Sequence, residues 1–394
     1  MQYRVDPRSG NQLSLLGFGM MRLPRGLSSI DQEKTTALVK EAVAGGVNYF
    51  DTAYIYPGSE VALGRALAET GLRDQVFLAT KLPHQRCSGT EDFDRIFDEQ
   101  LARLQTDRID YYLVHNLPSP AAWRRVQNLG IEQWLENRRQ SGQIGQIGFS
   151  FHGSQDDFML LLDAWDFDFV QIQYNYLDVN YQAGQVGLKA AAERNLMVVV
   201  MEPLRGGKLA TGLPKQAVAR IAESEEGLTP AALAFAWLYG QSDITVVLSG
   251  MGNLEQLQEN LVTASRVYPE AFNDNQRQLV DQVIELIQAE YRVACTGCNY
   301  CMPCAYGVNI PDCFMALNTR ITQGAVAGWS QYFSGIKPHD GERYSGPGRC
   351  RACRACESKC PQGLNIVELL AEVKRRMEPT WMRPLLSVIR GMAG

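Results

Sequence analysis

The chain has 394 residues, of which 45% are apolar and 21% charged, with a formal net charge of −5. This composition is ordinary for a globular protein and excludes a disordered or fibrous one. The acidic balance gives no overall attraction to nucleic acid. No apolar stretch approaches the roughly 20 residues that span a bilayer, and the first ten residues lack the apolar core of a signal peptide. We therefore expect a cytoplasmic protein that binds neither nucleic acid nor membrane.

Up to about residue 280, short β-branched segments alternate with longer amphipathic ones. The segments predicted as strands are residues 15–19, 48–51, 77–81, 109–115, 144–150, 169–174, 197–201 and 245–249. The segments with helical spacing of apolar residues are 32–44, 92–104, 131–140, 155–162, 187–194 and 230–239. Eight strands, each followed by room for a helix, predict an α/β fold of the (β/α)8 TIM barrel type rather than an open sheet. Residues 3–5 and 11–13 predict a hairpin that caps the barrel floor.

Eight of the ten cysteines fall in two runs beyond the barrel. The first cysteine run is Cys295, Cys298, Cys301 and Cys304, and the second cysteine run is Cys350, Cys353, Cys356 and Cys360. The second run has the spacing C-x2-C-x2-C-x3-C-P, which is the bacterial ferredoxin pattern for a 4Fe–4S cluster. In the first run the last spacer has two residues instead of three, and Ala305 replaces the proline.

These spacings predict two 4Fe–4S clusters with crossed ligation, in which the fourth cysteine of each run serves the other cluster. Cys360 would then complete the cluster of the first run, and Cys304 that of the second. The short spacer before Cys304 leaves a single cluster as an alternative. Structural zinc is a further alternative, but zinc ribbons usually present two separated pairs of cysteines. Cys87 and Cys313 lie outside both runs and are predicted to be buried thiols.

The cysteine runs divide the chain into two predicted domains: the barrel, 1–280, and a small, mostly α, ferredoxin-like iron–sulfur domain, 281–394. The helices predicted around the runs are residues 275–291, 311–322 and 365–377, with a loop at 335–348. The apolar, basic tail from residue 381 is predicted to form a helix that packs on the barrel.

Ionisable and phenolic residues stand where three successive predicted strands end, which is where barrel enzymes carry their chemistry. Asp51 ends the second strand and Tyr56 follows it, Lys81 ends the third, and His115 ends the fourth. A lysine beside a phenol lowers the pKa of the phenol, and Asp51 would keep that lysine charged. Tyr56 could then protonate an oxygen near neutral pH while His115 donates a hydrogen bond to the same oxygen.

The motifs D-T-A-x-x-Y, T-K and V-H resemble the catalytic tetrad of the aldo/keto reductases. The segments G-F-S-F-H, V-Q-I-Q-Y-N, E-P-L-R-G-G-K-L and S-G-M-x-x-L-x-Q-L-x-E-N are similar to the cofactor-side loops of that superfamily, and the resemblance covers about residues 12–265. The whole chain is similar to the branch with a C-terminal 4Fe–4S ferredoxin-type domain. The resemblance implies that Tyr56 is the general acid, that Lys81 and Asp51 tune it, and that His115 orients the carbonyl.

The resemblance also implies which residues contact a nicotinamide cofactor. These are Ser150 and Gln171 at the carboxamide, Arg205, Gly206, Gly207, Lys208 and Leu209 over the pyrophosphate, and Glu259 and Asn260 at the adenine. Three positions depart from the usual pattern. Phe151 replaces an asparagine that bonds the carboxamide. Gly250 and Met251 stand where many members carry Lys-Ser for the 2′-phosphate, and Gln256 stands where they carry arginine. The choice between NADPH and NADH therefore stays open, with Lys208 or Arg266 as substitute cations.

Together these observations predict a nicotinamide-dependent oxidoreductase that reduces an aldehyde or ketone and carries an attached iron–sulfur module, for electron transfer or for structure. Its expected partners are a small-molecule carbonyl substrate and a redox partner protein at the iron–sulfur domain. The alternative is an electron-transfer protein whose barrel is only a docking scaffold. Retention of all four tetrad residues weighs against that alternative. A metal-dependent barrel hydrolase is disfavoured because only His115 of the four histidines lies securely at a strand end.

Overall fold

The computed structural model describes residues 1–26, 29–224, 227–266, 272–297, 299–336, 344–360 and 362–382. The chain forms two compact units, Met1–Ala210 with Ile221–Val280, and Thr211–Arg220 with Asp281–Gly394. Cys298, Pro361 and most of the predicted tail helix lie outside the described residues. Among the helices that are described, none has the length and apolar character needed to cross a bilayer.

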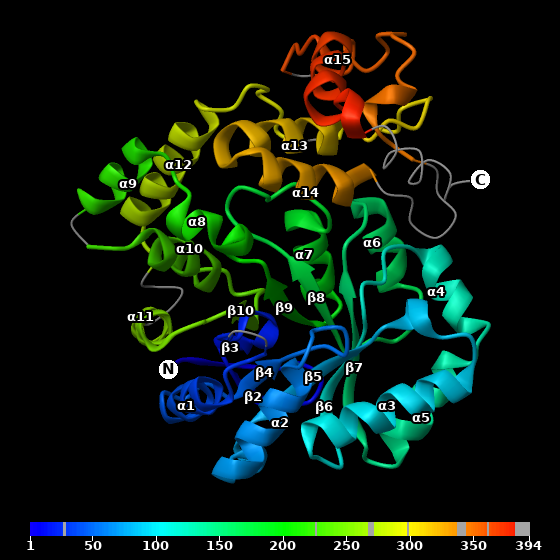
Figure 1. Ribbon diagram of the computed structural model, residues 1–394, viewed down its shortest axis with the longest axis vertical. Coiled ribbons are helices and arrows are strands. Elements are labelled where there is room, and N and C mark those ends of the chain that lie inside the picture. The colour runs from blue at the N-terminus through cyan, green and yellow to red at the C-terminus, as the bar shows by residue number, and fades with distance from the viewer. Residues whose placement is uncertain are drawn as a thin grey trace. The chain divides into compact units, whose positions relative to one another are not determined.

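Eight parallel strands close into a barrel in the order β10-β3-β4-β5-β6-β7-β8-β9, which confirms the predicted fold of the first unit (Figure 1). The strands are β3 (Leu16–Gly19), β4 (Tyr49–Asp51), β5 (Phe77–Leu82), β6 (Ile109–Val114), β7 (Ile144–Phe151), β8 (Phe169–Gln173), β9 (Met197–Met201) and β10 (Val246–Ser249). Each end lies within one residue of its prediction. Almost every strand residue is buried, as expected for parallel strands covered by helices on the outside and filled by side chains on the inside.

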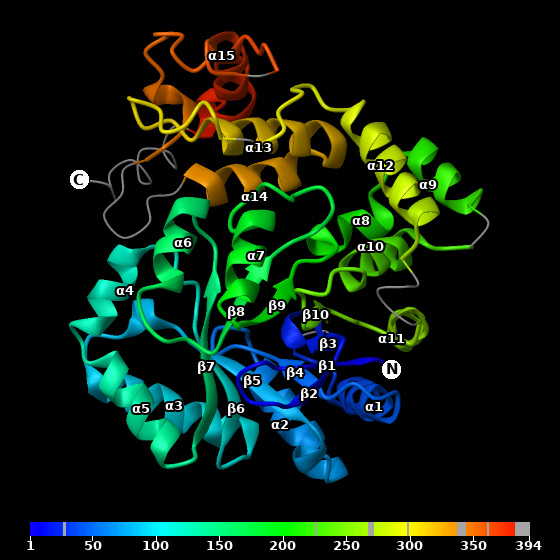
Figure 2. The same cartoon turned by 180° about the vertical axis from the view of Figure 1, so that it is seen from behind.

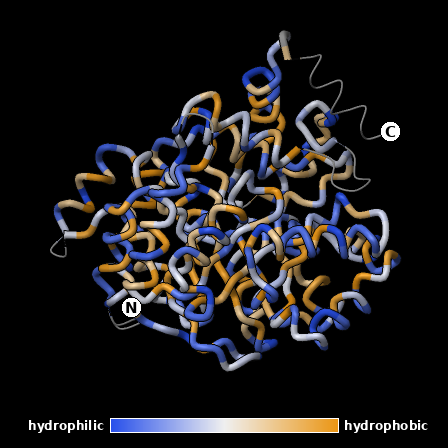
Figure 3. The backbone as a smooth tube through the Cα atoms, turned by 60° about the horizontal axis from the view of Figure 1, so that its bottom comes forward, coloured by the Kyte–Doolittle hydropathy of each residue, from blue (hydrophilic) through white to orange (hydrophobic). Residues whose placement is uncertain are grey.

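Helices surround the strands on the outside of the barrel (Figure 2). They are α1 (Gln32–Ala44), α2 (Ser59–Thr70), α3 (Thr90–Leu104), α4 (Pro120–Gln127), α5 (Ile131–Gln140), α6 (Gln155–Leu162), α7 (Gly184–Glu193), α8 (Lys208–Thr211), α10 (Pro230–Tyr239) and α11 (Leu254–Ala264), while α9 (Lys215–Ala222) falls mainly in the second unit. Orange and blue segments alternate along the helices (Figure 3), as expected when one face is apolar. Asp31 caps α1, because its carboxylate accepts a hydrogen bond from the Lys34 amide at 3.1 Å.

Aromatic side chains fill one end of the barrel interior. Tyr111 packs edge-on against Tyr49 and Phe169, with ring centroids 5.3 Å apart in both pairs. The Tyr111 hydroxyl donates a hydrogen bond to Asp6 at 2.9 Å. Asp6 belongs to the turn between β1 (Tyr3–Val5) and β2 (Gln12–Ser14), which pair antiparallel as predicted. The hairpin is therefore tied to the barrel interior by a buried hydrogen bond.

The second unit is helical in the part that the structure describes. Its elements are the end of α12 (Asp274–Gln288), α13 (Ile310–Gln323), α14 (Ala325–Ile336) and α15 (Ile366–Met377). No sequence pattern predicts most of α14. Gly328 explains how α14 forms next to α13, since a Cβ there would lie 2.4 Å from the Cβ of Arg320. The helices enclose an apolar core that includes Phe314, Tyr332 and Val373.

Candidate active site and cysteine cavity

The barrel register brings the predicted tetrad together at the carboxyl ends of three neighbouring strands. Asp51 is the last residue of β4 and pairs with Ala79 of β5, and Lys81 lies two residues further along β5. The His115 amide donates to the Leu82 carbonyl at 2.9 Å just beyond β6. Tyr56 lies in the loop between β4 and α2. Sites at this end of a barrel are built in this way from separate strands.

Lys81 is the centre of the tetrad. Its ammonium donates to Asp51 Oδ1 at 2.6 Å and to the Thr52 carbonyl at 2.7 Å. The lysine side chain is only 1% exposed and that of Asp51 is 5% exposed. The Lys81 Nζ also lies 5.3 Å from the centroid of the Tyr56 ring. The Tyr56 ring meets the His115 ring edge-on, with centroids 6.0 Å apart. The structure thus places all four predicted side chains in one cluster.

The pKa of Tyr56 differs from the sequence-based expectation. Burial raises it above its ordinary value of 10, and although the Lys81 ammonium opposes that rise, Asp51 and Glu202 add to it. The expectation considered only the neighbouring charge and omitted the cost of burying a phenolate. Tyr56 therefore keeps its proton at neutral pH, which is the form that a general acid needs when a carbonyl is reduced.

His115 is held neutral at this site. Burial lowers its pKa well below 6.5, and the positive charge of Lys81 lowers it further. Its Nδ1 atom is buried and has no hydrogen-bond partner among the described residues. A neutral imidazole has one donor and one acceptor nitrogen, so His115 can donate one hydrogen bond without carrying charge. This agrees with an orienting role and not with that of a proton source.

The two residues expected at the nicotinamide carboxamide border the tetrad. Ser150 of β7 pairs in register with Gln171 of β8. The Gln171 amide donates to Asp51 Oδ2 at 2.9 Å, and the Ser150 hydroxyl accepts from the Asn116 amide at 2.8 Å. Both side chains are buried. Gln171 therefore supports the second oxygen of Asp51, a contact that the sequence alone did not suggest.

The remaining predicted cofactor residues lie in the segment after β9, up to the start of α8, and on α11. Arg205 forms an ion pair with Asp178 at 3.0 Å, with both side chains largely buried. Gly206 and Gly207 have φ of +71° and +93°, which glycine adopts at little cost. Lys208 and Leu209 follow at the start of α8.

On α11, Asn260 donates to Ser249 at 3.0 Å, and Glu259 accepts a hydrogen bond from Thr229. The structure describes every predicted cofactor residue, but it distributes them over several loops and gives some of them protein partners.

Two residues near the tetrad were missed. The Thr52 carbonyl is the second acceptor for Lys81, and it could have been found because it directly follows Asp51 at the strand end. Glu202, with φ of +55°, contributes charge to the Tyr56 environment. It directly follows β9, so the strand-end rule that found Lys81 and His115 also applies to it.

The sequence model of the aldo/keto reductase family matches residues 15–281, about two thirds of the chain. The chain belongs to the aldo/keto reductase family. It is therefore an oxidoreductase of that family, as predicted.

Similar proteins agree with the family assignment. An aldo-keto reductase of Schizosaccharomyces pombe, whose name includes NADP(+), is 24% identical over 70% of this chain and 91% of its own length. One of Mycobacterium avium is 30% identical over 60% of this chain and 78% of its own length. Among solved structures, an aldo-keto reductase from Bacillus halodurans in its holo form has a TM-score of 0.60 at 24% identity, covering 72% of this chain and 96% of its own.

A second solved structure is the Klebsiella pneumoniae aldo/keto reductase in complex with NADP and acetate. It has a TM-score of 0.59 at 22% identity and covers 72% of this chain and 96% of its own. At these identities the solved structures establish the fold of the reductase barrel. The cysteine runs lie beyond the residues that the family model matches.

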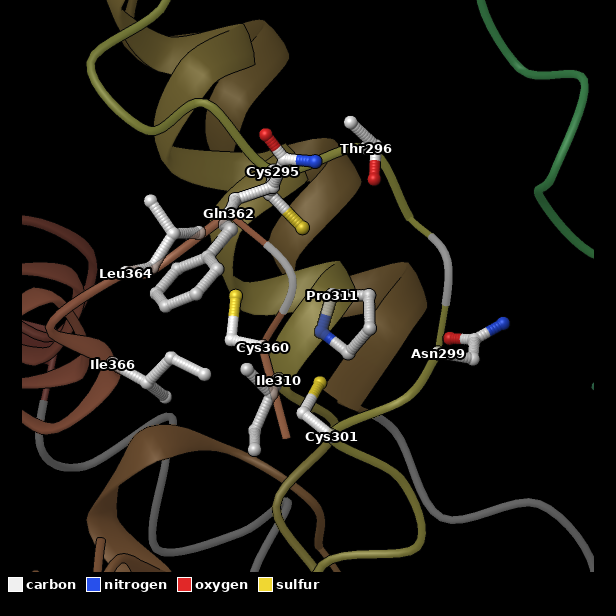
Figure 4. A pocket seen from close by; sticks show the side chains of 11 residues that line it. Cys295, Thr296, Asn299, Cys301, Ile310, Pro311, Cys360, Gln362, Leu364 and Ile366 are labelled. Carbon is white, nitrogen blue, oxygen red and sulfur yellow. The ribbon is translucent and has the colours of Figure 1, made fainter. Parts of the chain in front are cut away.

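Outside the reductase barrel, the second unit contains a small cavity lined by cysteines from both runs. Cys295 and Cys301 of the first run and Cys360 of the second line it together, and Figure 4 shows their sulfur atoms within the same space. Asn318 on α13 fixes the approach to the first run, because it bonds the Val293 amide and carbonyl at 2.9 and 2.7 Å. The cavity wall is otherwise mainly apolar and includes Ile310, Pro311, Phe314, Leu364 and Ile366.

Cys356 of the second run lies within electrostatic reach of Cys304 and Cys350. The pKa of the Cys356 thiol is raised, mainly by burial and also by Glu357, Cys304 and Cys350. The chain segments are joined here by Arg349, whose guanidinium donates to the Tyr306 carbonyl at 2.6 Å. The Ala352 amide donates to the Cys350 sulfur at 3.4 Å. Among the described residues, which omit Cys298, no group of three or more His, Cys, Asp or Glu could by itself hold a metal ion.

The two cysteines outside the runs are buried, as predicted. Cys313 is fully buried in the core of the second unit and Cys87 is 4% exposed. Burial raises the pKa of the Cys87 thiol to about 11 and raises that of Cys313 as well. Neither thiol is therefore ionised at neutral pH, and both act as small apolar side chains.

Proposed function

We propose that this aldo/keto reductase reduces an aldehyde or a ketone to an alcohol with NADPH or NADH. The observation that carries the proposal is the cluster in which Lys81 bonds Asp51 and also lies beside the ring of Tyr56. A scaffold that only docked a redox partner would not need a buried ion pair oriented toward a phenol at the mouth of a barrel. The names of the S. pombe and K. pneumoniae relatives support NADP as the cofactor.

Each tetrad residue has a distinct task in this proposal. The nicotinamide supplies the hydride when it is bound. Tyr56 gives its phenolic proton to the substrate oxygen, and His115 donates a hydrogen bond to that oxygen and so orients the carbonyl. Asp51 holds the Lys81 ammonium in place. That ammonium stabilises the phenolate left after proton transfer, which offsets part of the cost of forming it in a buried site.

The test is anaerobic assay of the purified full chain with a panel of aldehydes and ketones. We expect NADPH or NADH to be oxidised only when a substrate is present, which is measured as a loss of absorbance at the nicotinamide band. One alcohol should form per cofactor consumed. A protein that binds either cofactor but turns over no carbonyl in the panel would favour the docking-scaffold alternative.

We also propose that the second unit is a ferredoxin-like domain that holds two 4Fe–4S clusters with crossed ligation. The shared cavity of Cys295, Cys301 and Cys360 supports Cys360 as the fourth ligand of the first-run cluster. The electrostatic coupling of Cys356 with Cys304 and Cys350 supports the reciprocal arrangement. These residues fit a cluster better than a single zinc ion, because a cluster separates its thiolate ligands by its own width, whereas one ion draws four ligands together.

The surface around the second cysteine run supports a role for this unit in electron transfer. Cys353 is exposed, and the side chains of Arg351, Arg354 and Lys359 are exposed within six residues of it. A basic rim next to a cluster ligand would attract an acidic carrier protein and accelerate its encounter. We therefore propose a redox partner of acidic character at this rim, and expect its reduction of the clusters to slow as salt concentration rises.

Metal analysis tests the domain assignment independently of catalysis. Anaerobically purified protein should contain about eight iron and eight acid-labile sulfide atoms per chain. A count near four would support the single-cluster alternative. Zinc without sulfide would reject the iron–sulfur proposal, while the reductase proposal would be unaffected.

A further inference from the structure

We propose that Arg22 binds the pyrophosphate of the nicotinamide dinucleotide, an inference that rests on the proposed function. Arg22 follows β3 directly, at the end of a short 3-10 turn, Met20–Arg22. It is therefore at the barrel face that carries the tetrad. None of the motifs that resemble cofactor loops includes it, yet it lies against two of them.

The guanidinium of Arg22 contacts the loop after β9. Its Nη1 donates to the Gly206 carbonyl at 2.8 Å. A Cβ built on Gly206 would lie 3.0 Å from Nη2, and one on Gly207 would lie 4.0 Å from Nη1. Any side chain at position 206 would therefore crowd the guanidinium, and the left-handed backbone of both glycines would add strain. The turn presents its backbone, and not a side chain, to Arg22.

The aliphatic stem of Arg22 lies over the loop after β10. A Cβ on Gly250 would lie 3.3 Å from both Cβ and Cδ of Arg22. β10 pairs with β9 on one side and with β3 on the other. The segments that follow these three adjacent strands therefore make the contacts of Arg22. The stem occupies the space in which a side chain at position 250 would begin. This gives a physical reason for glycine at a position where a lysine was expected by resemblance.

The charge of Arg22 is available to a ligand. Among the residues that the structure describes, no carboxylate forms an ion pair with it, whereas Arg205 in the neighbouring loop is paired with Asp178 at 3.0 Å. A guanidinium has five N–H donors, and the Gly206 carbonyl takes one. The others suit phosphate oxygens, which arginine binds with two parallel hydrogen bonds. Because the guanidinium lies at Gly206 and only the stem lies over Gly250, the geometry points to the pyrophosphate and not to the 2′-phosphate.

The test is the binding of NADPH and of NADH, each measured by calorimetry on anaerobically purified full chain. Arg22→Gln should raise the Kd of both cofactors by the same factor, about 10-fold or more, as expected when a charged hydrogen bond is lost. Arg22→Lys should give a smaller loss, since it keeps the charge without the fork. Arg65→Gln is the matched control, because Arg65 is an exposed arginine on α2, and its Kd values should stay within about twofold of wild type.

Two outcomes would decide against the inference. If Arg22→Gln binds both cofactors within about twofold of wild type, Arg22 has no role in binding. If only NADPH is weakened, Arg22 contacts the 2′-phosphate and the pyrophosphate assignment is wrong. Thermal unfolding of each variant distinguishes loss of binding from loss of fold. Failure of the wild type to bind either cofactor would instead reject the proposed function.

Discussion

The barrel and the second unit, called here the cysteine unit because it carries both cysteine runs, position their reactive side chains by different means. In the barrel, Asp51 and Lys81 are 30 residues apart and become neighbours because parallel strands of fixed register end at the same face. In the second unit, the cysteines of each run lie three or four residues apart, on the segments that connect α12 to α13 and α14 to α15. The first arrangement depends on the whole fold, and the second depends mainly on local spacing and on the packing of two segments.

This difference has consequences for how each site tolerates change. The tetrad is surrounded by strands whose residues are almost all buried, so its geometry is maintained without a ligand. The cysteine runs are only partly buried, and Cys353 is exposed. We infer that the barrel is preorganised, while the cysteine unit gains much of its order from the clusters proposed above, as metal-dependent domains commonly do.

The largest effect is expected for Tyr56→Phe, which removes one hydroxyl group from the preorganised site without disturbing its packing. The phenyl ring keeps its packing, but the proton donor is lost, so kcat for carbonyl reduction should fall by about 100-fold or more. Binding of NADPH should stay close to wild type. The measurement is steady-state kinetics with any active carbonyl, together with the Kd of the cofactor. A variant with more than a tenth of wild-type kcat would show that Tyr56 is not the general acid.

The cysteine unit should respond to Cys360→Ser in a way that separates crossed from local ligation. In the crossed arrangement the variant loses or alters the cluster held by Cys295, Cys298 and Cys301. Cys353→Ser is the matched comparison and should affect the other cluster. Iron content and the spectrum of the reduced protein, measured anaerobically, distinguish the two variants. Identical spectral changes in both would mean that each run ligates its own cluster.

Most of the barrel could be predicted because its signals are local. Buried parallel strands are short, largely apolar runs, so all eight were found, and the N-cap of α1 is recognisable from Asp31 alone. Helix α14 was missed because it depends on contact with α13 at Gly328, which no local pattern reveals. The residues 211–220, which lie within the predicted barrel domain, group with the second unit through tertiary contacts that local sequence does not encode.

The tetrad could be predicted because Asp51, Lys81 and His115 lie at or next to strand ends and Tyr56 follows Asp51 in the next loop. Its electrostatics could not be predicted. Burial decides the direction of the pKa of Tyr56, and the extent of burial becomes known only when the loops are folded over the site. The same limit applies to Gln171, whose bond to Asp51 crosses 120 residues of sequence, and to the ion pair of Arg205 with Asp178. Pairings between loops depend on side-chain directions that strand spacing leaves open.

A smaller effect on stability should reveal the neutral state of His115. Because its folded pKa lies well below 6.5, the unfolded chain takes up the extra proton first as the pH falls. The contribution of neutral His115 to the stability of the folded state is therefore fully present above pH 6.5. It is lost as the pH drops toward the folded pKa. Between pH 7.5 and 5.5 the wild type should lose on the order of 1 kcal/mol more stability than His115→Asn. Urea unfolding at both pH values measures this difference, and equal losses would mean that His115 is not held neutral.

The smallest effect is expected at Gln256. The resemblance to the family implies that this position faces the 2′-phosphate of the cofactor. Gln256 is exposed, and its side chain accepts a hydrogen bond from the Gly252 amide at 2.8 Å. An arginine there would offer a charged fork to a 2′-phosphate, but solvent and salt would screen the interaction. We expect Gln256→Arg to shift the NADPH to NADH affinity ratio by about 5- to 10-fold toward NADPH, or roughly 1 kcal/mol.

Gln258→Arg is the matched control for this last prediction. It adds the same charge two residues along α11, where the side chain points to a different side of the helix, and Gln258 is also exposed. If both variants shift the ratio equally, the effect is one of general charge and Gln256 does not face the 2′-phosphate. A wild type that already prefers NADPH by more than about 1000-fold, or about 4 kcal/mol, would mean that another cation supplies the selectivity. Arg22 would not explain such a preference, because a contact to the pyrophosphate stabilises NADPH and NADH alike.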